Sequence, residues 1–390
     1  MHHYIPYAQQ WVDEEDIQEV LETLKSDYLT TGPKINAFED KLKEAVGAKY
    51  AVAVANGTAA LHAACFAAGI GEEDEVITTP MTFAASANCA LYMGARPIFA
   101  DIDPRTYNID PKDIQSKITS RTKAIIPVHF TGQPCDMDPI LKLARDNGLA
   151  VIEDGAHALG AEYKGRKIGS IGDMTTFSFH PVKHITTGEG GAVTTNSEAL
   201  YNKLMMFRTH GITRDSKQLL KNEGPWYYEQ HFLGYNYRMT DIQAALGVKQ
   251  LEKLPLFLQK RRAYVEKYNK AFSNIEELII PYQLEAVKSS WHLYIIQLKL
   301  DKLNMGRRNV FEALRQKNIG VNVHYIPVYD HPYYRKLGYR QGQCPNAEKL
   351  YAGIITLPLF PKMKEEEADY VIESLLEVIE NGKSVPVVER

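Results

Sequence analysis

The chain has 390 residues, of which 45% are hydrophobic and 24% are charged, and its formal net charge is -3. This length and composition are typical of a globular protein with one large and one smaller domain, or with a single large α/β unit. The charge balance excludes a basic surface of the kind that binds nucleic acid, so we expect no nucleic-acid partner.

The first predicted element is a helix after Asp13, because this N-cap residue is followed by acidic residues such as Asp16. From residue 50 onward, short apolar runs alternate with helical stretches, which indicates a mostly parallel sheet covered by helices. The predicted strands are 50–55, 75–80, 96–102, 123–130, 149–154, 175–180 and 191–196. Helices are predicted between them at 58–68, 83–94 and 138–148.

A long helical stretch begins near Thr240, and we expect Pro255 to interrupt it. The runs that follow predict a small α/β domain, and they lie at 291–300, 306–317, 321–327 and 364–380. We therefore assign residues 13–250 to a large domain and residues 251–390 to a small C-terminal domain. The packing of residues 1–12 is left open.

The amino terminus lacks the charge and apolar core of a signal peptide, and no apolar run reaches the ~18 residues of a membrane span. We expect a cytoplasmic protein with no membrane partner. The cysteines are scattered without a CxxC pair, which favours packing roles for Cys65, Cys89, Cys135 and Cys344. His129 and Cys135 have no further ligands at metal-binding spacing, so no metal is expected.

The segment ANGTAAL, residues 55–61, joins a predicted strand to a predicted helix through Gly57 and Thr58. Free backbone N–H groups and the helix dipole make such a turn a place for a phosphate, with the Thr58 hydroxyl as a further donor. The alternative is a capped helix without a ligand. A single glycine here does not match the G-x-G-x-x-G of a dinucleotide-binding fold.

The segment VIEDGAHALG, residues 151–160, ends a buried strand in Glu153 and Asp154, and His157 follows. In an open parallel sheet, ligands bind beyond the carboxyl ends of the strands, so a carboxylate here lies where a ligand would be. The alternative is that Asp154 caps a helix and that His157 is solvated.

The segment FSFHPVKHITTGEGG, residues 177–191, places Ser178 and Lys183 after a strand and before a cluster of glycines. A lone lysine is usually a solvated surface charge. Near a phosphate site and a buried carboxylate, Lys183 is instead a candidate Schiff-base nucleophile, because partial burial changes the pKa of lysine readily.

Together these three segments supply what pyridoxal 5'-phosphate needs. The phosphate needs N–H and hydroxyl donors, the pyridine nitrogen needs a carboxylate, and the aldehyde needs an amine. The conjunction is far more specific than any of its parts.

At these residues the sequence resembles the DegT/DnrJ/EryC1/StrS sugar aminotransferases, a family of fold-type I pyridoxal-phosphate enzymes. Within the family it is most similar to the PseC-type enzymes, the UDP-4-amino-4,6-dideoxy-N-acetyl-β-L-altrosamine transaminases of pseudaminic acid biosynthesis. The matching motifs are LTTGPKINAFEDKL, NGTAAL, EVITTPMTFAASAN, EDGAHALG, FSFHPVKHITTGEGGAVTTN, GYNYRMTDIQAALG and VHYIPVY. The resemblance implies a mostly parallel seven-stranded sheet in the large domain.

The resemblance also implies roles for individual residues. Lys183 would bond to the cofactor and move the proton, Asp154 would pair with the pyridinium, and His157 would contact the ring hydroxyl region. Phe83 would stack on the ring. The phosphate would be held by Gly57, Thr58 and Ser178, with Asn236 reaching in from the second subunit of a homodimer. Candidates for substrate binding are Thr30, Thr31, Gly32, Glu189, Arg238, His324 and Tyr325.

The implied reaction moves nitrogen from L-glutamate to C4 of a UDP-4-keto-6-deoxy-N-acetylhexosamine and releases 2-oxoglutarate. A lysine at position 183 favours transamination, because relatives that remove a sugar hydroxyl carry histidine there. Two alternatives stay open. One is an aminotransferase for another UDP- or dTDP-keto-sugar, acting at C3 or C4 in surface or spore-coat glycan synthesis. The other is a non-catalytic regulator that binds the cofactor.

Arg238 has a structural ion pair as its alternative role. The aromatic segment 226–232 either lines the sugar site or packs in the dimer interface.

Overall fold

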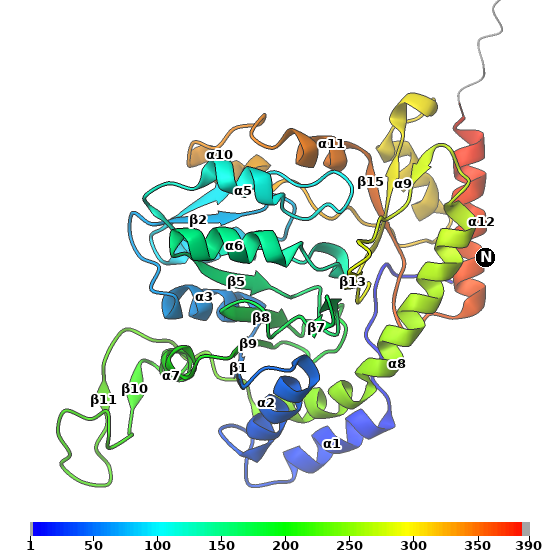
Figure 1. The fold of residues 1–390 in the computed structure, drawn as a ribbon. Helices are drawn as coiled ribbons and strands as arrows, with labels where there is room; N and C mark the ends of the chain where they lie inside the picture. Colours follow the sequence, from blue (N-terminus) through cyan, green and yellow to red (C-terminus); the bar gives the residue numbers. More distant parts are fainter. Residues whose placement is uncertain (1–2, 384–390) are drawn as a thin grey trace, which may run out of the picture.

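The computed structural model describes residues 3–383, and a seven-stranded, mostly parallel sheet lies at its centre (Figure 1). The strand order is β1-β9-β8-β5-β4-β2-β3, and β9 alone runs against its neighbours in this sheet. The bounds are β1 Tyr50–Val54, β2 Glu75–Thr78, β3 Arg96–Phe99, β4 Thr122–Ile126, β5 Ala150–Asp154, β8 Met174–Ser178 and β9 Gly191–Thr195. All the predicted strands of the large domain are confirmed, with ends that differ by a few residues.

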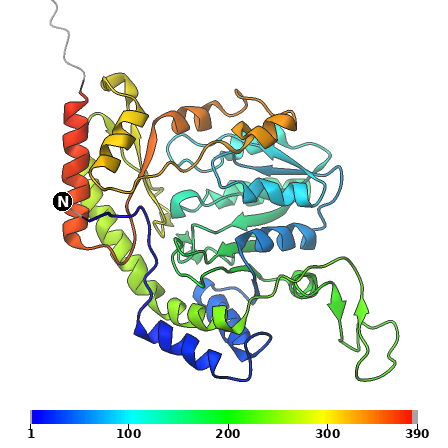
Figure 2. The same cartoon turned by 180° about the vertical axis from the view of Figure 1, so that it is seen from behind.

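Helices cover both faces of the sheet, as the alternation of strands and helices predicts. One face carries α3 (Gly57–Ala67), α4 (Ala85–Tyr92) and α7 (Glu198–Phe207). The other carries α2 (Pro33–Val46), α5 (Pro111–Lys117), α6 (Met137–Asn147) and the first part of α8 (Asp241–Phe272). The same layers are seen from behind in Figure 2.

Helix α1 (Glu14–Leu24) begins where the sequence predicts. The side chain of Asp13 accepts hydrogen bonds from the N–H groups of Glu15 and Asp16, and the side chain of Asp16 accepts one from the N–H of Asp13. This capping box satisfies donors that the helix itself leaves free.

The predicted break at Pro255 is wrong, because α8 runs through this proline as one helix of 32 residues. Proline removes one backbone hydrogen bond from a helix. Here buried side chains on both sides of the proline, Leu254 and Phe257 among them, pack in the large core. Tertiary packing of this apolar face outweighs the local penalty.

The C-terminal part has its own core around a small sheet and the second half of α8. The sheet has the order β12 (Leu278–Ile279), β14 (Tyr294–Leu298), β15 (Ile354–Leu357), and α9 (Arg307–Gln316) and α12 (Glu365–Asn381) complete the region. The apolar run at 321–327 forms only an isolated bridge, between Asn322 and Thr356.

The chain between β14 and β15 returns to the large sheet through α10 (Pro332–Lys336) and α11 (Pro345–Gly353). Tyr334 and Tyr339 pack there against Phe99 of β3. The division of the domains at residue 250 stays a prediction, and α8 spans it. The outermost residues of the predicted ranges, 1–2 and 384–390, lie outside the described residues.

The amino-terminal segment, whose packing the sequence left open, crosses the C-terminal region before it reaches α1. Ile5 is buried and forms a bridge with Ile319, and the carbonyl of Tyr7 accepts from the N–H of Leu359 at 3.0 Å. Trp11 then stacks on Phe257 of α8. The segment therefore connects α8 to the core of the C-terminal region.

Two short sheets complete the fold. One joins β6 (Glu162–Tyr163), β7 (Arg166–Lys167) and β13 (Val287–Lys288). The other is the hairpin of β10 (Ile212–Thr213) and β11 (Glu229–Gln230), which projects from the body as an arm (Figures 1 and 2). Among residues 3–383, no helix is long and apolar enough to cross a membrane.

Candidate active site

The turn between β1 and α3 combines a helix N-terminus with close backbone packing. The side chain of Asn56 accepts from the N–H of Ala59 at 2.8 Å, so the N–H groups of Gly57 and Thr58 stay outside the helical ladder. A Cβ on Gly57 would lie 2.9 Å from the Cβ of Ser178. The three predicted phosphate residues are therefore brought together, and glycine is needed for their close approach.

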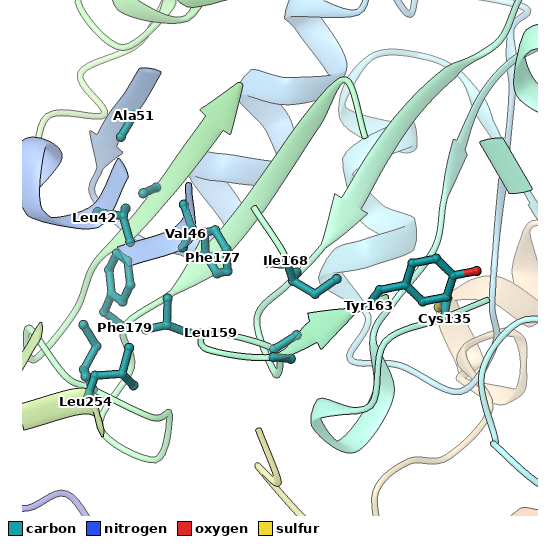
Figure 3. Close-up of a cluster of buried hydrophobic side chains, with 14 of the residues drawn as sticks. Leu42, Val46, Ala51, Cys135, Leu159, Tyr163, Ile168, Phe177, Phe179 and Leu254 are labelled. Atoms are coloured by element: carbon teal, nitrogen blue, oxygen red, sulfur yellow. The ribbon is translucent and has the colours of Figure 1, made fainter. Parts of the chain in front are cut away.

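Ser178 faces α3 because side chains alternate along a strand. Phe177 and Phe179, on either side of it, point into the core and pack near Val46 and Leu254 (Figure 3). The strand β8 thus uses one face for the core and leaves its last hydroxyl beside the helix terminus.

Asp154 ends β5, and its side chain is buried. One carboxylate oxygen, Oδ2, accepts from the hydroxyl of Ser86 at 2.6 Å, and Oδ1 accepts from the N–H of Ala156 at 3.1 Å. No helix follows within residues 155–161, so Asp154 is not a helix cap. Its neighbour Glu153 instead holds a structural bond to His129 at 2.8 Å.

Lys183 lies half-buried in the turn after β8, where its N–H donates to the carbonyl of His180 at 2.8 Å. Burial lowers the pKa of Lys183 to about 8, and the charge of Asp154 acts in the opposite direction. A lysine with this pKa presents a neutral amine to an aldehyde far more often than a surface lysine does.

His157 is buried next to Lys183 and is not solvated. Burial holds the pKa of His157 well below its usual value, and the charge of Lys183 adds to this effect. Its Nε2 lies 3.2 Å from the hydroxyl of Tyr325, and its ring lies 4.3 Å from that of His292. Among the described residues, its Nδ1 has no hydrogen-bond partner.

Phe83 lies just before α4, and its side chain is 64% exposed. Its ring centroid is 6.4 Å from that of Tyr325, which in turn contacts His157. An exposed aromatic ring beside buried polar groups suits a flat ligand better than it suits the core.

The other substrate candidates gather at the start of α8. Asp241 accepts from the N–H of Gly32 at 2.7 Å, and Thr30 forms a bridge with Thr240. The carbonyl of Glu189 accepts from Gln243 at 2.8 Å. Thr30, Thr31 and Glu189 are exposed, so their side chains are open to solvent.

His324 is separate from this group and lies near Lys183. Burial lowers the pKa of His324 to about 3, and the charge of Lys183 adds to this effect. Its Nδ1 lies 2.8 Å from the hydroxyl of Thr356. Asn236 is exposed and Arg238 half-buried on the loop before α8. Within residues 3–383, the hydrogen bonds of Asp154 and His157 go to other residues than Asn236 and Arg238.

Sequence reasoning missed three neighbours of this site. Ser86 bonds to Asp154, Tyr7 packs on His324 with ring centroids 5.4 Å apart, and His292 packs on His157. Ser86 had one signal, since it lies three residues after Phe83 at helical spacing. Tyr7 and His292 come from distant segments and had none.

These residues fit pyridoxal 5'-phosphate. The helix terminus at Gly57 offers N–H donors, Asp154 offers a buried carboxylate, and Lys183 offers an amine of lowered pKa. Gly57 packs closely on Ser178, and the ring of Phe83 is exposed. Donors for a phosphate and an aromatic face for a ring therefore lie at one edge of the sheet. Within the described part of the chain, no cluster of three or more His, Cys, Asp or Glu could hold a metal ion.

The comparisons with known proteins agree with this chemistry. The model of the DegT/DnrJ/EryC1/StrS aminotransferase family matches residues 10–376. The spore coat polysaccharide biosynthesis protein SpsC of Bacillus subtilis is 45% identical, over 97% of this chain and 98% of SpsC. A UDP-4-amino-4,6-dideoxy-N-acetyl-beta-L-altrosamine transaminase of Campylobacter jejuni is 39% identical, over 97% of this chain and 98% of the relative.

Among solved structures, the PLP-form of Spr1654 from Streptococcus pneumoniae is similar over 97% of this chain and 99% of its own. The TM-score is 0.91 and the sequence identity is 33%. The fold-type I architecture and the resemblance to the family are confirmed, and the alternative of a non-catalytic regulator is dropped. The chain belongs to the DegT/DnrJ/EryC1/StrS aminotransferase family and is a pyridoxal-phosphate-dependent sugar aminotransferase.

Proposed function

We propose that this enzyme transfers an amino group from L-glutamate to the keto carbon of a nucleotide-linked 4-keto-6-deoxy sugar. The observation that carries the proposal is the position of Lys183, half-buried beside Asp154 and His157 at the carboxyl edge of the sheet. When bound, pyridoxal 5'-phosphate supplies an aldehyde and a ring that accepts the electron pair released at the donor's α-carbon.

Each candidate cofactor residue has a stated role in this proposal. Lys183 would hold the cofactor through its amine and, once free, would take the proton from the donor's α-carbon. Asp154 would keep the ring nitrogen protonated. His157, whose Nε2 lies 3.2 Å from the hydroxyl of Tyr325, would contact the ring hydroxyl region. The α3 terminus, Thr58 and Ser178 would bind the phosphate.

For the sugar, we propose a UDP-4-keto-6-deoxy-N-acetylhexosamine that is aminated at C4. The product would be UDP-4-amino-4,6-dideoxy-N-acetyl-β-L-altrosamine, the precursor class of pseudaminic acid. The support is the 39% identity to the Campylobacter jejuni transaminase that is named for this product. The substrate-binding candidates are Thr30, Thr31, Gly32, Glu189, Arg238, His324 and Tyr325.

A second candidate has its own support. The 45% identity to SpsC of Bacillus subtilis favours a different keto-sugar nucleotide, destined for spore-coat or surface polysaccharide. The two candidates share every cofactor residue and differ only in the sugar, so a substrate panel separates them.

We further propose a homodimer in which Asn236 of each subunit completes the phosphate site of the other. Asn236 is exposed, and it lies between β11 and α8, where it forms a bridge with Thr209. Mixing two inactive variants, Lys183→Ala and Asn236→Ala, should restore activity, because one site of the mixed dimer keeps both residues. No recovery after subunit exchange, shown by mass spectrometry of tagged dimers, would contradict shared sites.

The test of the reaction begins with the visible spectrum of the reconstituted enzyme. L-Glutamate should replace the yellow band of the lysine-bound cofactor with the band of its amine form. Adding each keto-sugar nucleotide of a panel to the amine form should restore the yellow band only for a substrate. The product's mass and proton NMR spectrum then give the position of the new amine. A panel in which UDP-linked 4-keto sugars leave the band unchanged would overturn the proposed substrate.

A further inference from the structure

Asp154 accepts a short hydrogen bond that the proposed reaction does not use. The hydroxyl of Ser86 lies 2.6 Å from Oδ2 of Asp154, and it also lies 2.6 Å from the hydroxyl of Thr82. Ser86 is 1% exposed, Thr82 is 3% exposed and Asp154 is 4% exposed, so water does not compete for these bonds.

The direction of these bonds follows from the number of protons. A serine hydroxyl has one proton, and an ionised carboxylate can only accept, so Ser86 gives its proton to Asp154. The carbonyl of Phe83 lies 3.3 Å from the same hydroxyl and is the more distant, uncharged acceptor. The hydroxyl of Thr82 must then donate to Ser86. The result is a directed chain from Thr82 through Ser86 to Asp154, in which each bond polarises the next.

The start of this chain lies next to Phe83. Thr82 immediately precedes Phe83. Ser86 lies three residues after Phe83, in the first turn of α4. The carbonyl of Phe83 also receives the N–H of Ser86 at 3.2 Å. One short segment, residues 82–86, therefore holds both the ring proposed to cover the cofactor and the donor to its carboxylate.

We infer that Ser86 is a positioning residue, which orients the Asp154 carboxylate for the pyridinium nitrogen. Thr82 supports Ser86 in this role. A hydrogen bond to a charged acceptor is about twice as strong as a neutral one and holds the acceptor in one plane. The N–H of Ala156 already occupies the other oxygen, Oδ1, at 3.1 Å. Two fixed donors thus define the plane of the carboxylate before a cofactor arrives.

This inference rests on the role proposed for Asp154, and its test needs neither sugar nor amino donor. The dissociation constant of pyridoxal 5'-phosphate is measured on the apoenzyme by equilibrium dialysis. The visible band of the loaded enzyme is recorded from about pH 5 to 9, a range that includes the lowered pKa of Lys183, about 8. Ser86→Ala should raise the dissociation constant about tenfold, the usual effect of losing one charge-assisted bond. It should also change the pH profile of the visible band of the bound cofactor.

Three further variants separate positioning from packing. Ser86→Cys keeps the volume but donates weakly, so it should behave like Ser86→Ala. Thr82→Val should weaken binding in the same direction by a smaller factor, and Thr82→Ser should restore it. Ser374→Ala is the matched control, since Ser374 is equally buried at 2% but lies on α12. It should leave both readouts unchanged.

The outcomes distinguish the two proposals. If Asp154→Asn weakens cofactor binding while Ser86→Ala and Ser86→Cys match the wild type, the role of Ser86 is overturned and that of Asp154 stands. If Asp154→Asn leaves cofactor binding and the pH profile unchanged, the role proposed for Asp154 fails first. If Ser86→Ala lowers only the melting temperature, with the dissociation constant within about twofold of wild type, Ser86 is structural.

Discussion

The residues around Lys183 and the residues of the surface loops are held in opposite ways. Asp154, His157 and Ser86 are buried. Ser86 donates to Asp154 at 2.6 Å, and His157 lies 3.2 Å from the hydroxyl of Tyr325. Thr31, Glu189 and Asn236 have exposed side chains, and their loops are fixed mainly through backbone groups. The difference is what the proposed function requires, a preformed site for the cofactor beside a more adaptable surface for the sugar.

The largest effect should come from the centre of the buried group. Lys183→Ala removes both the amine that bonds to the cofactor and the carrier of the proton, so turnover should fall by at least ~10³-fold. Steady-state assays with L-glutamate and the keto-sugar would measure this fall. Retained turnover would break the assignment of the buried group as the reacting one.

A pH dependence should distinguish Lys183 from a surface lysine. Because burial lowers the pKa of Lys183 to about 8, its protonated amine loses its proton as the pH rises through that value. The rate at which the apoenzyme captures pyridoxal 5'-phosphate should rise about tenfold per pH unit below about 8 and level off above it. A rate that keeps rising to about pH 10 would show an ordinary solvated lysine.

A steric test addresses the glycine that lets α3 approach the sheet. A Cβ at Gly191 would lie 2.4 Å from the carbonyl group of Asn56, so Gly191→Ala must displace the start of α3. We expect a loss of about 1–3 kcal/mol in the free energy of unfolding, the usual cost of overpacking, measured in urea. Gly71→Ala is the control, because a Cβ added at Gly71 would meet no atom of the described residues within 4 Å beyond its own chain neighbours. Its effect should stay within ~0.5 kcal/mol. Equal losses in both variants would contradict close packing at Gly191.

The smallest effect should come from the exposed loops. Arg238→Ala should raise the KM for the sugar nucleotide about fivefold to tenfold, because one contact to a phosphate charge is lost. The spectral change with L-glutamate should be unaffected. Arg308→Ala provides the control, since this arginine is solvated and pairs with Glu312 on α9. An equal change in both half-reactions would place Arg238 in the cofactor site instead.

Most of the fold and the centre of the site could be predicted from the sequence. The strands are continuous apolar runs, and the ends of three neighbouring segments carry Gly57, Asp154 and Lys183 in recognisable motifs. The local rule failed at Pro255, where the packing of α8 on the large core outweighs the missing hydrogen bond. The apolar run 321–327 forms only one bridge, between Asn322 and Thr356. Thr356 lies too far along the chain for local pattern to predict this pairing.

The sequence by itself determined the chemistry. A lysine, a carboxylate and a turn suited to a phosphate each follow a predicted strand, and local sequence pattern is enough to recognise them. Only the tertiary structure decided which side chains support them. Ser86 reaches Asp154, Tyr325 reaches His157 and Tyr7 reaches His324 across separations that periodicity does not report. The reason is physical: hydrogen bonds and burial that tune a site depend on how distant segments pack, and packing is a property of the whole chain.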